Sequence, residues 1–251
     1  MRNKNFNKKL VILPIISFVA IFVLLAPSAM AATPYAFYTD PTFHTINGAL
    51  FGTYVTVDPT GSGVFDAFLR ISGGQENKPP PKCCVKGYNT DGELEFDEVT
   101  SSTFTYAFHL AWVPIVYLDN YQGHTGWYRE FQLDINEDEG GDSEYLSLDE
   151  LEIYLTYDQY LTGYPFDDSD PTGDPTGKAT KVWELDDGAD NYLILNYSMN
   201  AGGGKRDIIM WIPNEDFENN PYYDNCGYIG SFYIEVDSED YQLEKEEDQI
   251  E

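Results

Sequence analysis

The stretch that decides the fold is residues 127–157, WYREFQLDINEDEGGDSEYLSLDELEIYLTY. It opens with Tyr128–Leu133, where bulky and polar residues alternate with the period of two that is typical of a half-buried strand. Apolar residues resume a similar pattern from Leu146 onward, and an acidic segment with two glycines separates the two runs. We therefore predict two β-strands joined by an acidic loop.

Oxygen-bearing side chains stand at alternate positions in this acidic loop. Calcium takes about six to eight oxygen ligands from carboxylates, amides and carbonyls in flexible loops. We predict a Ca2+ site whose candidate ligands are Asp134, Asn136, Asp138, Asp142, Asp149 and Glu150. The loop is not an EF-hand, because Glu139 and Tyr145 stand where that motif has glycine and glutamate. A solvated hairpin loop is the alternative interpretation.

Two other acidic loops are weaker candidates for a cation. One contains Asp186, Asp187 and Asp190, and the other contains Asp168 and Asp170. Glycine or proline accompanies the aspartates in both loops, as expected of turns. Each loop is also compatible with a solvated surface turn.

Short strand patterns recur along the rest of the chain. The predicted strands outside the central stretch lie within residues 33–57, 64–71, 93–97, 103–116, 181–185, 192–199, 207–212 and 227–236. Asn47-Gly48 is a turn signal, residues 73–86 read as a loop, and Gly202–Gly204 is expected to turn a hairpin between the strands on either side. This pattern predicts an all-β fold: a single-domain β-sandwich or jelly roll over residues 32–240, followed by an acidic tail at 241–251.

The N-terminal segment has the three parts of a secretory signal peptide. Four basic residues within residues 2–9 precede an apolar run over Leu10–Leu25, and Ala29-Met30-Ala31 is a small-x-small cleavage site. We expect residues 1–31 to be removed, which gives a secreted, extracellular or cell-surface protein with no membrane span in the mature chain. An uncleaved anchor is the alternative, although the run is short for a span.

The chain is strongly acidic, with 14 Lys and Arg against 43 Asp and Glu and a formal net charge of −29. This charge disfavours nucleic acid and anionic membranes as partners and favours cations. A solvated surface or adaptation to a saline habitat explains the acidity equally well.

The chain has three cysteines, Cys83, Cys84 and Cys226. A disulfide is permitted outside the cytoplasm. Because adjacent cysteines rarely bridge each other, we expect Cys226 to pair with Cys83 or with Cys84. The remaining thiol is then either unpaired or linked to another chain.

Several motifs along the mature chain match one pattern. They are Gly61-x-Gly63-x-Phe65-x-x-Phe68-x-Arg70-Ile71, the GYNTDG run at 87–92, YREFxLDIN at 128–136, LSLDELxIYL at 146–155 and YSMNxG at 197–202. By these motifs the chain resembles a group of uncharacterised secreted bacterial proteins, many of which carry a PEP-type C-terminal sorting tail. The resemblance implies an exported β-rich protein of the surface or matrix and supplies no known activity. The acidic C-terminal segment of this chain lacks the Pro-Glu-Pro motif of that tail.

One further motif resembles the catalytic strand of laminarinase-like jelly-roll glycosidases, Glu-x-Asp-x-x-Glu. That spacing places the nucleophile, a helper aspartate and the acid on one face of a strand. The matching line here is Gln132-x-Asp134-x-x-Glu137. Glutamine cannot form the glycosyl ester, so we predict that the protein is not an enzyme of this kind. An inactive sugar-binding relative is still compatible with the motif.

We therefore predict a secreted, non-catalytic protein that binds calcium and acts in adhesion or as a structural component of the extracellular matrix or cell surface. A carbohydrate-binding module is one alternative, although large rings in a sandwich are more often core. Its candidate aromatic residues are Trp112, Trp127, Tyr128, Trp183 and Trp211. Another alternative is a filament subunit that lends a strand from Thr33–Val57 to a neighbour. The expected partners are accordingly cations, glycans, other surface or matrix proteins, or further copies of the chain.

Overall fold

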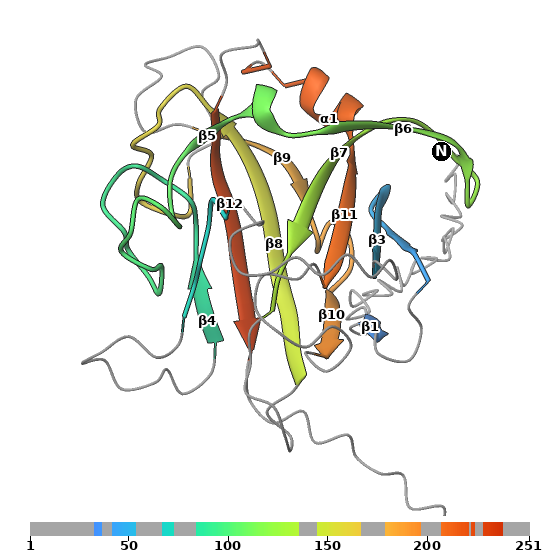
Figure 1. Ribbon diagram of the computed structural model, residues 1–251, viewed down its shortest axis with the longest axis horizontal. Coiled ribbons are helices and arrows are strands. Elements are labelled where there is room, and N and C mark those ends of the chain that lie inside the picture. Colours follow the sequence, from blue (N-terminus) through green and yellow to red (C-terminus); the bar gives the residue numbers. More distant parts are fainter. Residues whose placement is uncertain are drawn as a thin grey trace, which may run out of the picture. The chain divides into compact units, whose positions relative to one another are not determined.

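The computed structural model describes residues 33–36, 42–53, 67–72, 84–135, 145–166, 179–196, 207–220, 222–223 and 228–237. These residues form twelve strands, one 3-10 helix and one short α-helix (Figure 1). They all belong to one compact unit, residues 31–251. The all-β prediction is confirmed. The predicted signal peptide at 1–31 and the acidic tail at 241–251 lie outside the described residues.

The larger sheet has seven strands. They are β1 (Thr33–Ala36), β4 (Cys84–Gly87), β5 (Phe108–His109), β8 (Tyr145–Thr156), β9 (Thr180–Glu184), β10 (Asn191–Asn196) and β12 (Tyr228–Asp237). The order is β1-β10-β8-β12-β4, with β9 beside β8 and β5 beside β12. β1 pairs with β10 in parallel, and the other pairs are antiparallel.

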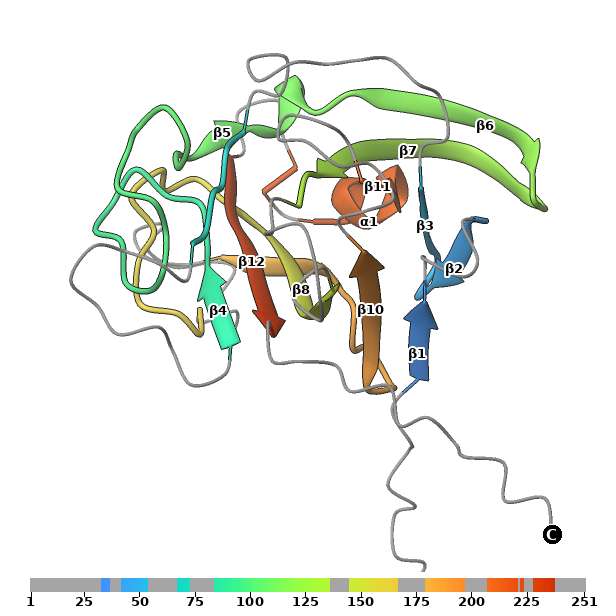
Figure 2. The same ribbon diagram turned by 60° about the horizontal axis from the view of Figure 1, so that its bottom comes forward.

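The second sheet has five strands. They are β2 (His44–Ile46), β3 (Ala49–Thr53), β6 (Ile115–Tyr121), β7 (His124–Leu133) and β11 (Ile208–Pro213). The order is β2-β3-β11-β7-β6, antiparallel throughout. The 3-10 helix η1 (Leu110–Trp112) precedes β6, and α1 (Asn214–Glu218) follows β11. In Figure 2, β6 and β7 form a long curved hairpin.

Both sheets contribute side chains to one hydrophobic cluster. From the larger sheet it takes Leu151 and Leu155 of β8, and from the second sheet Phe51, Phe131 and Ile212. Two sheets that share a buried layer are the arrangement of a β-sandwich, which supports that part of the prediction. The jelly-roll connectivity stays a prediction.

The turn predicted at Asn47-Gly48 is confirmed. It joins β2 to β3, and both residues have positive φ, 48° and 79°. Two left-handed residues are the signature of the two-residue hairpin turn, which explains why asparagine followed by glycine stands there. The segment Thr33–Val57, proposed above as a donated strand, pairs within its own chain through β1, β2 and β3. Residues 54–57 lie outside the described residues.

The hairpin predicted across residues 200–206 is wrong. β10 pairs with β1 and β8 in the larger sheet, whereas β11 pairs with β3 and β7 in the other sheet. Gly202–Gly204 lie outside the described residues. Two apolar runs separated by glycines are typical of a hairpin, but here each run completes a different layer of the core.

Other boundaries also differ from the prediction. Residues 103–116 do not form one strand, because Phe108–His109 alone are extended before η1, and Pro114 precedes β6. Residues 93–97 are irregular, and the described part of 64–71 contributes one bridge, Ile71 with Glu98. The loop predicted over 73–86 ends earlier, because β4 begins at Cys84. Thr105, Phe108 and Val113 in these segments are buried without belonging to long strands, whereas Phe104 and Trp112 are exposed.

Candidate functional site

The predicted calcium ligands are divided between the two sheets. Asp134 follows β7 in the five-stranded sheet, whereas Asp149 and Glu150 lie in β8 of the larger one. Five other candidates lie outside the described residues: Asn136, Asp138, Asp142, Asp168 and Asp170. Within the part of the chain that the structure describes, no group of three His, Cys, Asp or Glu side chains is arranged to hold a metal ion. The calcium site stays a prediction.

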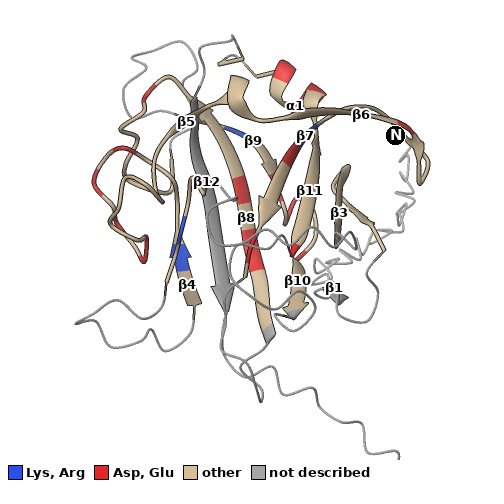
Figure 3. Ribbon diagram, in the orientation of Figure 1, with Lys and Arg blue, Asp and Glu red and all other residues tan. Residues whose placement is uncertain are grey.

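The structure nevertheless places Asp149 near the second acidic loop, the turn between β9 and β10. Burial raises the pKa of Asp186 in this turn, and the charges of Asp190, Glu184 and Asp149 raise it further. The backbone N–H of Asn191 donates to Asp186 at 2.9 Å and opposes that shift. Carboxylates from β8, β9 and the turn therefore share one negative region; Figure 3 shows acidic residues along β8 and on α1.

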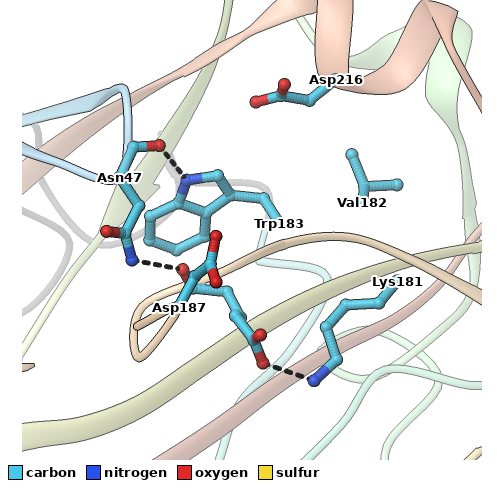
Figure 4. Close-up of a pocket in the computed structure, with 7 residues that line it drawn as sticks. Asn47, Lys181, Val182, Trp183, Asp187 and Asp216 are labelled. Carbon is cyan, nitrogen blue, oxygen red and sulfur yellow. Dashed lines mark hydrogen bonds and ion pairs between the residues drawn. The ribbon is translucent and has the colours of Figure 1, made fainter. Parts of the chain in front are cut away.

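A pocket of about 280 Å³ lies beside this turn (Figure 4). It is lined by Asn47, Lys181, Val182, Trp183, Glu184, Asp187 and Asp216. Among the described residues of the predicted cation loops, Asp187 is therefore the one that lines this pocket. Glu184 and Asp216 add carboxylates from β9 and α1, so three separate elements contribute acidic groups to its wall.

The ammonium group in the pocket is held by ion pairs. Lys181 Nζ lies 2.5 Å from an oxygen of Glu152 and 2.5 Å from an oxygen of Glu184. Burial disfavours the charge on this lysine, but its hydrogen bonds to the two carboxylates outweigh burial and raise the pKa of Lys181. Lys181 is thus a charged partner of Glu152 and Glu184, and a neutral, nucleophilic amine is not expected here.

Asp216 is the carboxyl group in the pocket whose pKa is shifted by its surroundings. Burial raises the pKa of Asp216 to about 6, and the adjacent charge of Glu215 contributes. A partly buried carboxylate with a raised pKa in a pocket is a candidate for ligand binding or proton transfer. The sequence contains no signal for this residue, because its burial depends on how α1 packs beside the pocket.

Asn47 ties the β2–β3 turn to β9. Its Nδ2 donates to the carbonyl of Leu185 at 2.7 Å and to that of Glu184 at 3.1 Å. The backbone carbonyl of Asn47 accepts a hydrogen bond from Trp183 Nε1 at 3.0 Å (Figure 4). The turn thus connects the second sheet to the larger one at the pocket.

The aromatic residues proposed for sugar binding fall into two groups. Trp183 and Tyr128 are buried, and Trp211 stacks on Phe43 with ring centroids 4.6 Å apart. Trp112 and Trp127 are instead 66% and 59% exposed. Two of the four tryptophans are therefore available at the surface.

Trp127 belongs to an exposed strip on the β6–β7 hairpin, which we call the aromatic strip: Ile115, Tyr117 and Trp127. Tyr117 lies directly opposite Trp127 in the strand register, and Ile115 is two residues from Tyr117, so all three side chains share one face. The rings of Tyr117 and Trp127 are 4.9 Å apart and tilted by 59°. Ile115 and Tyr117 are 48% and 52% exposed.

The strip is exposed because the hairpin extends beyond its neighbour β11. That strand ends at Pro213, opposite Tyr128, so β7 residues nearer the hairpin turn pair with β6 alone among the described strands. Arg129, two residues from Trp127 on the same face, is already buried. Its Nη1 donates to the Leu110 carbonyl at 2.8 Å, which fixes η1 and the exposed Trp112 beside the hairpin. Burial lowers the pKa of Arg129.

The glycosidase-like motif lies at the end of β7. The Gln132 amide donates to Glu130 at 2.6 Å, and the other oxygen of Glu130 accepts from Trp211 Nε1 at 3.1 Å. Glu137 lies outside the described residues. Gln132 thus takes part in a hydrogen-bonded group on the sheet, and the absence of activity stays a prediction.

Of the cysteines, Cys84 lies in β4. Cys83 and Cys226 lie outside the described residues, so the predicted disulfide stays a prediction.

Four residues of these sites were not predicted from the sequence: Ile115, Tyr117, Asn47 and Asp216. A signal for the first two was present: Gln122-Gly123 is a turn, with φ of 50° and 87°, and folding the chain there places Tyr117 near Trp127. Comparisons with protein-family models, curated proteins and solved structures found no match for this chain. No helix within the described ranges has the length and apolar character needed to cross a membrane.

Proposed function

We propose that this protein binds carbohydrate without cleaving it, and that the sugar stacks on the aromatic strip. The observation that carries the proposal is the exposed, contacting pair Tyr117 and Trp127. Pyranose rings present C–H groups on their faces and hydroxyls at their edges. Tryptophan and tyrosine match both, because they combine a large apolar ring with a polar tip.

Polar groups on the same hairpin complete such a site. Asp119 is exposed two residues beyond Tyr117, and Thr125 is exposed two residues before Trp127. A binding site with mostly apolar walls and a few polar groups that orient the ligand is the usual arrangement for small ligands. The net charge of −29 repels anionic polysaccharides, so the proposed ligand is a neutral glycan.

The angle between the rings of Tyr117 and Trp127 indicates whether a soluble or a crystalline glycan fits them. Rings inclined by 59° do not make one flat platform. A single soluble chain can follow the turn from one ring to the other, whereas the flat face of a crystalline polysaccharide contacts one ring at a time. We propose an extracellular setting for this binding, in adhesion or in the matrix, as the N-terminal sequence predicts.

Affinity electrophoresis and titration calorimetry with soluble neutral polysaccharides test the proposal on residues 32–251. Trp127→Ala is expected to weaken binding about two- to tenfold, since ring contacts of this kind contribute on the order of 0.5–1.5 kcal/mol. Tyr160→Ala is the matched control, because Tyr160 is equally exposed, at 58%, but lies after β8. Equal binding by the wild type and Trp127→Ala would contradict the proposal.

Calcium binding is a second candidate, supported by the electrostatic proximity of Asp149 and of Asp190 to Asp186. A cation would neutralise these carboxylates and stabilise the folded chain by mass action. Thermal unfolding with Ca2+ and with EGTA tests it: Tm should rise with Ca2+ in the wild type and in Asp119→Asn. It should rise less in Asp186→Asn and in Asp149→Asn. A Tm that does not change when Ca2+ is added would contradict calcium binding.

A further inference from the structure

The exposed surface of the aromatic strip continues beyond β6 to the 3-10 helix η1. Trp112 of η1 is 66% exposed, and Pro114 and Ile115 after it are exposed as well. The segment Leu110–Leu118 contains no charged side chain, although 23% of the residues in the chain are charged. A ligand that extends from the strip toward η1 therefore meets apolar side chains and no carboxylate of this segment.

Arg129 shows that η1 lies on the face of the hairpin that carries the strip. Arg129 is two residues from Trp127 in β7 and directly opposite Ile115 in β6, so its side chain shares their face. The Nη1 of Arg129 donates to the Leu110 carbonyl at 2.8 Å, which holds η1 against this face. Trp112 is therefore exposed at the end of the strip where β6 begins.

The turn that carries Trp112 is anchored on both sides. Leu110 before it and Val113 directly after it are buried, and the Val113 N–H donates to the Leu110 carbonyl at 3.1 Å. The ring of Trp112 packs edge-on against His109, with centroids 5.0 Å apart. A ring that is held in place before the ligand arrives loses little conformational freedom on binding, so more of its contact energy appears as affinity.

The spacing of the rings determines how long a ligand must be to contact all of them. Tyr117 and Trp127 lie directly opposite each other, so a disaccharide can contact both rings. Trp112 precedes Tyr117 by five residues, which span at most about 18 Å when extended. A disaccharide stacked on the Tyr117–Trp127 pair ends short of Trp112, whereas a hexasaccharide reaches it.

We propose that Trp112 is a second stacking position of the same binding surface, and that the ligand is a neutral glycan chain long enough to contact Trp112 and the aromatic strip together. This inference rests on the proposed sugar binding at the strip. Sugar units that reach Trp112 are already joined to those on the strip, so the second contact adds affinity without a separate association step. Shorter oligosaccharides bind through the strip alone.

Titration calorimetry of residues 32–251 tests the inference with the disaccharide and the hexasaccharide of β-1,3-, β-1,4- and α-1,4-linked glucose. Trp112→Ala is expected to weaken binding of the hexasaccharide about two- to tenfold, the loss expected for one ring contact, and to leave binding of the disaccharide unchanged. Trp112→Phe keeps an aromatic ring and should bind the hexasaccharide more tightly than Trp112→Ala. Trp127→Ala should weaken binding of both lengths, because both use the strip.

The same titrations separate this inference from the proposed function. Trp112→Ala would overturn the inference if it bound the hexasaccharide as tightly as the wild type, while a loss in Trp127→Ala would still support sugar binding at the strip. Equal weakening of both lengths by Trp112→Ala, or equal binding by the two Trp112 variants, would also overturn it. If the wild type binds none of the hexasaccharides, the inference fails, and the polysaccharide titration described above decides whether the proposed function fails with it.

Discussion

Replacing Asp216 by asparagine is expected to make the protein more stable at neutral pH. The shape of the side chain is nearly kept, but the group can no longer ionise. Burial raises the pKa of Asp216 from the ordinary 3.8 to about 6, with Glu215 adding to the shift. The folded chain therefore binds more protons than the unfolded chain between about pH 4 and pH 6. Stability falls as pH rises through that window, and the cost is fully present at pH 7.

The size of the effect follows from that shift. About two pKa units correspond to an upper limit of about 3 kcal/mol. Asp216 is only partly buried, so solvent screening reduces the expected gain to about 1–2 kcal/mol. For a chain of this length that gain raises Tm by roughly 2–8 °C. Below about pH 4, where the wild-type carboxyl is protonated in both states, the two proteins should be equally stable.

Urea unfolding at pH 7.5 and pH 4, in EGTA so that no metal contributes, measures the difference. Glu215→Gln is the matched control, because Glu215 is its exposed neighbour on α1 and should give a smaller gain. The reasoning is refuted if Asp216→Asn is no more stable than the wild type at pH 7.5. It is also refuted if the gain is the same at pH 4, since the effect would then not come from the charge.

Three other outcomes are expected. Gly52→Ala should lower the free energy of unfolding by about 1–3 kcal/mol in urea titrations, because a Cβ there would lie 2.5 Å from ring atoms of Phe43. Glu98→Leu should cost about 2–4 kcal/mol in the same assay, because buried Glu98 accepts the backbone N–H groups of Tyr88 (3.1 Å) and Phe96 (2.8 Å), which would lose their acceptor. N-terminal sequencing of the exported protein should begin at residue 32; detection of residues 1–31 in it would contradict the signal-peptide prediction.

Features that depend on neighbouring residues were predictable from the sequence. The strand predicted at Tyr128–Leu133 and the Asn47-Gly48 turn both appear in the structure, because strand-forming side chains and left-handed turn residues are local properties. Features that depend on distant pairing were not. β10 and β11 follow one another in the chain, yet they lie in different sheets.

The candidate site residues show the same limit of prediction from local sequence. Trp127 and Trp183 are the same residue type in similar strand patterns, yet one is 59% exposed and the other 5%. The difference arises because β11 ends opposite Tyr128, which no local pattern records. Likewise Asp149 and Asp186 were assigned to separate candidate cation sites, and the β8–β9 pairing brings them into one electrostatic region.

The position of β12 has a consequence for the order of folding. It is the strand nearest the C-terminus among the described residues, yet it lies between β8 and β4 and also pairs with β5. Without it, β4 and β5 have no described strand beside them in the larger sheet. Contacts between residues far apart in sequence form slowly, because the loops that close them cost entropy first. The larger sheet therefore cannot close until residues 228–237 have been synthesised, even though most of its other strands precede them in the chain.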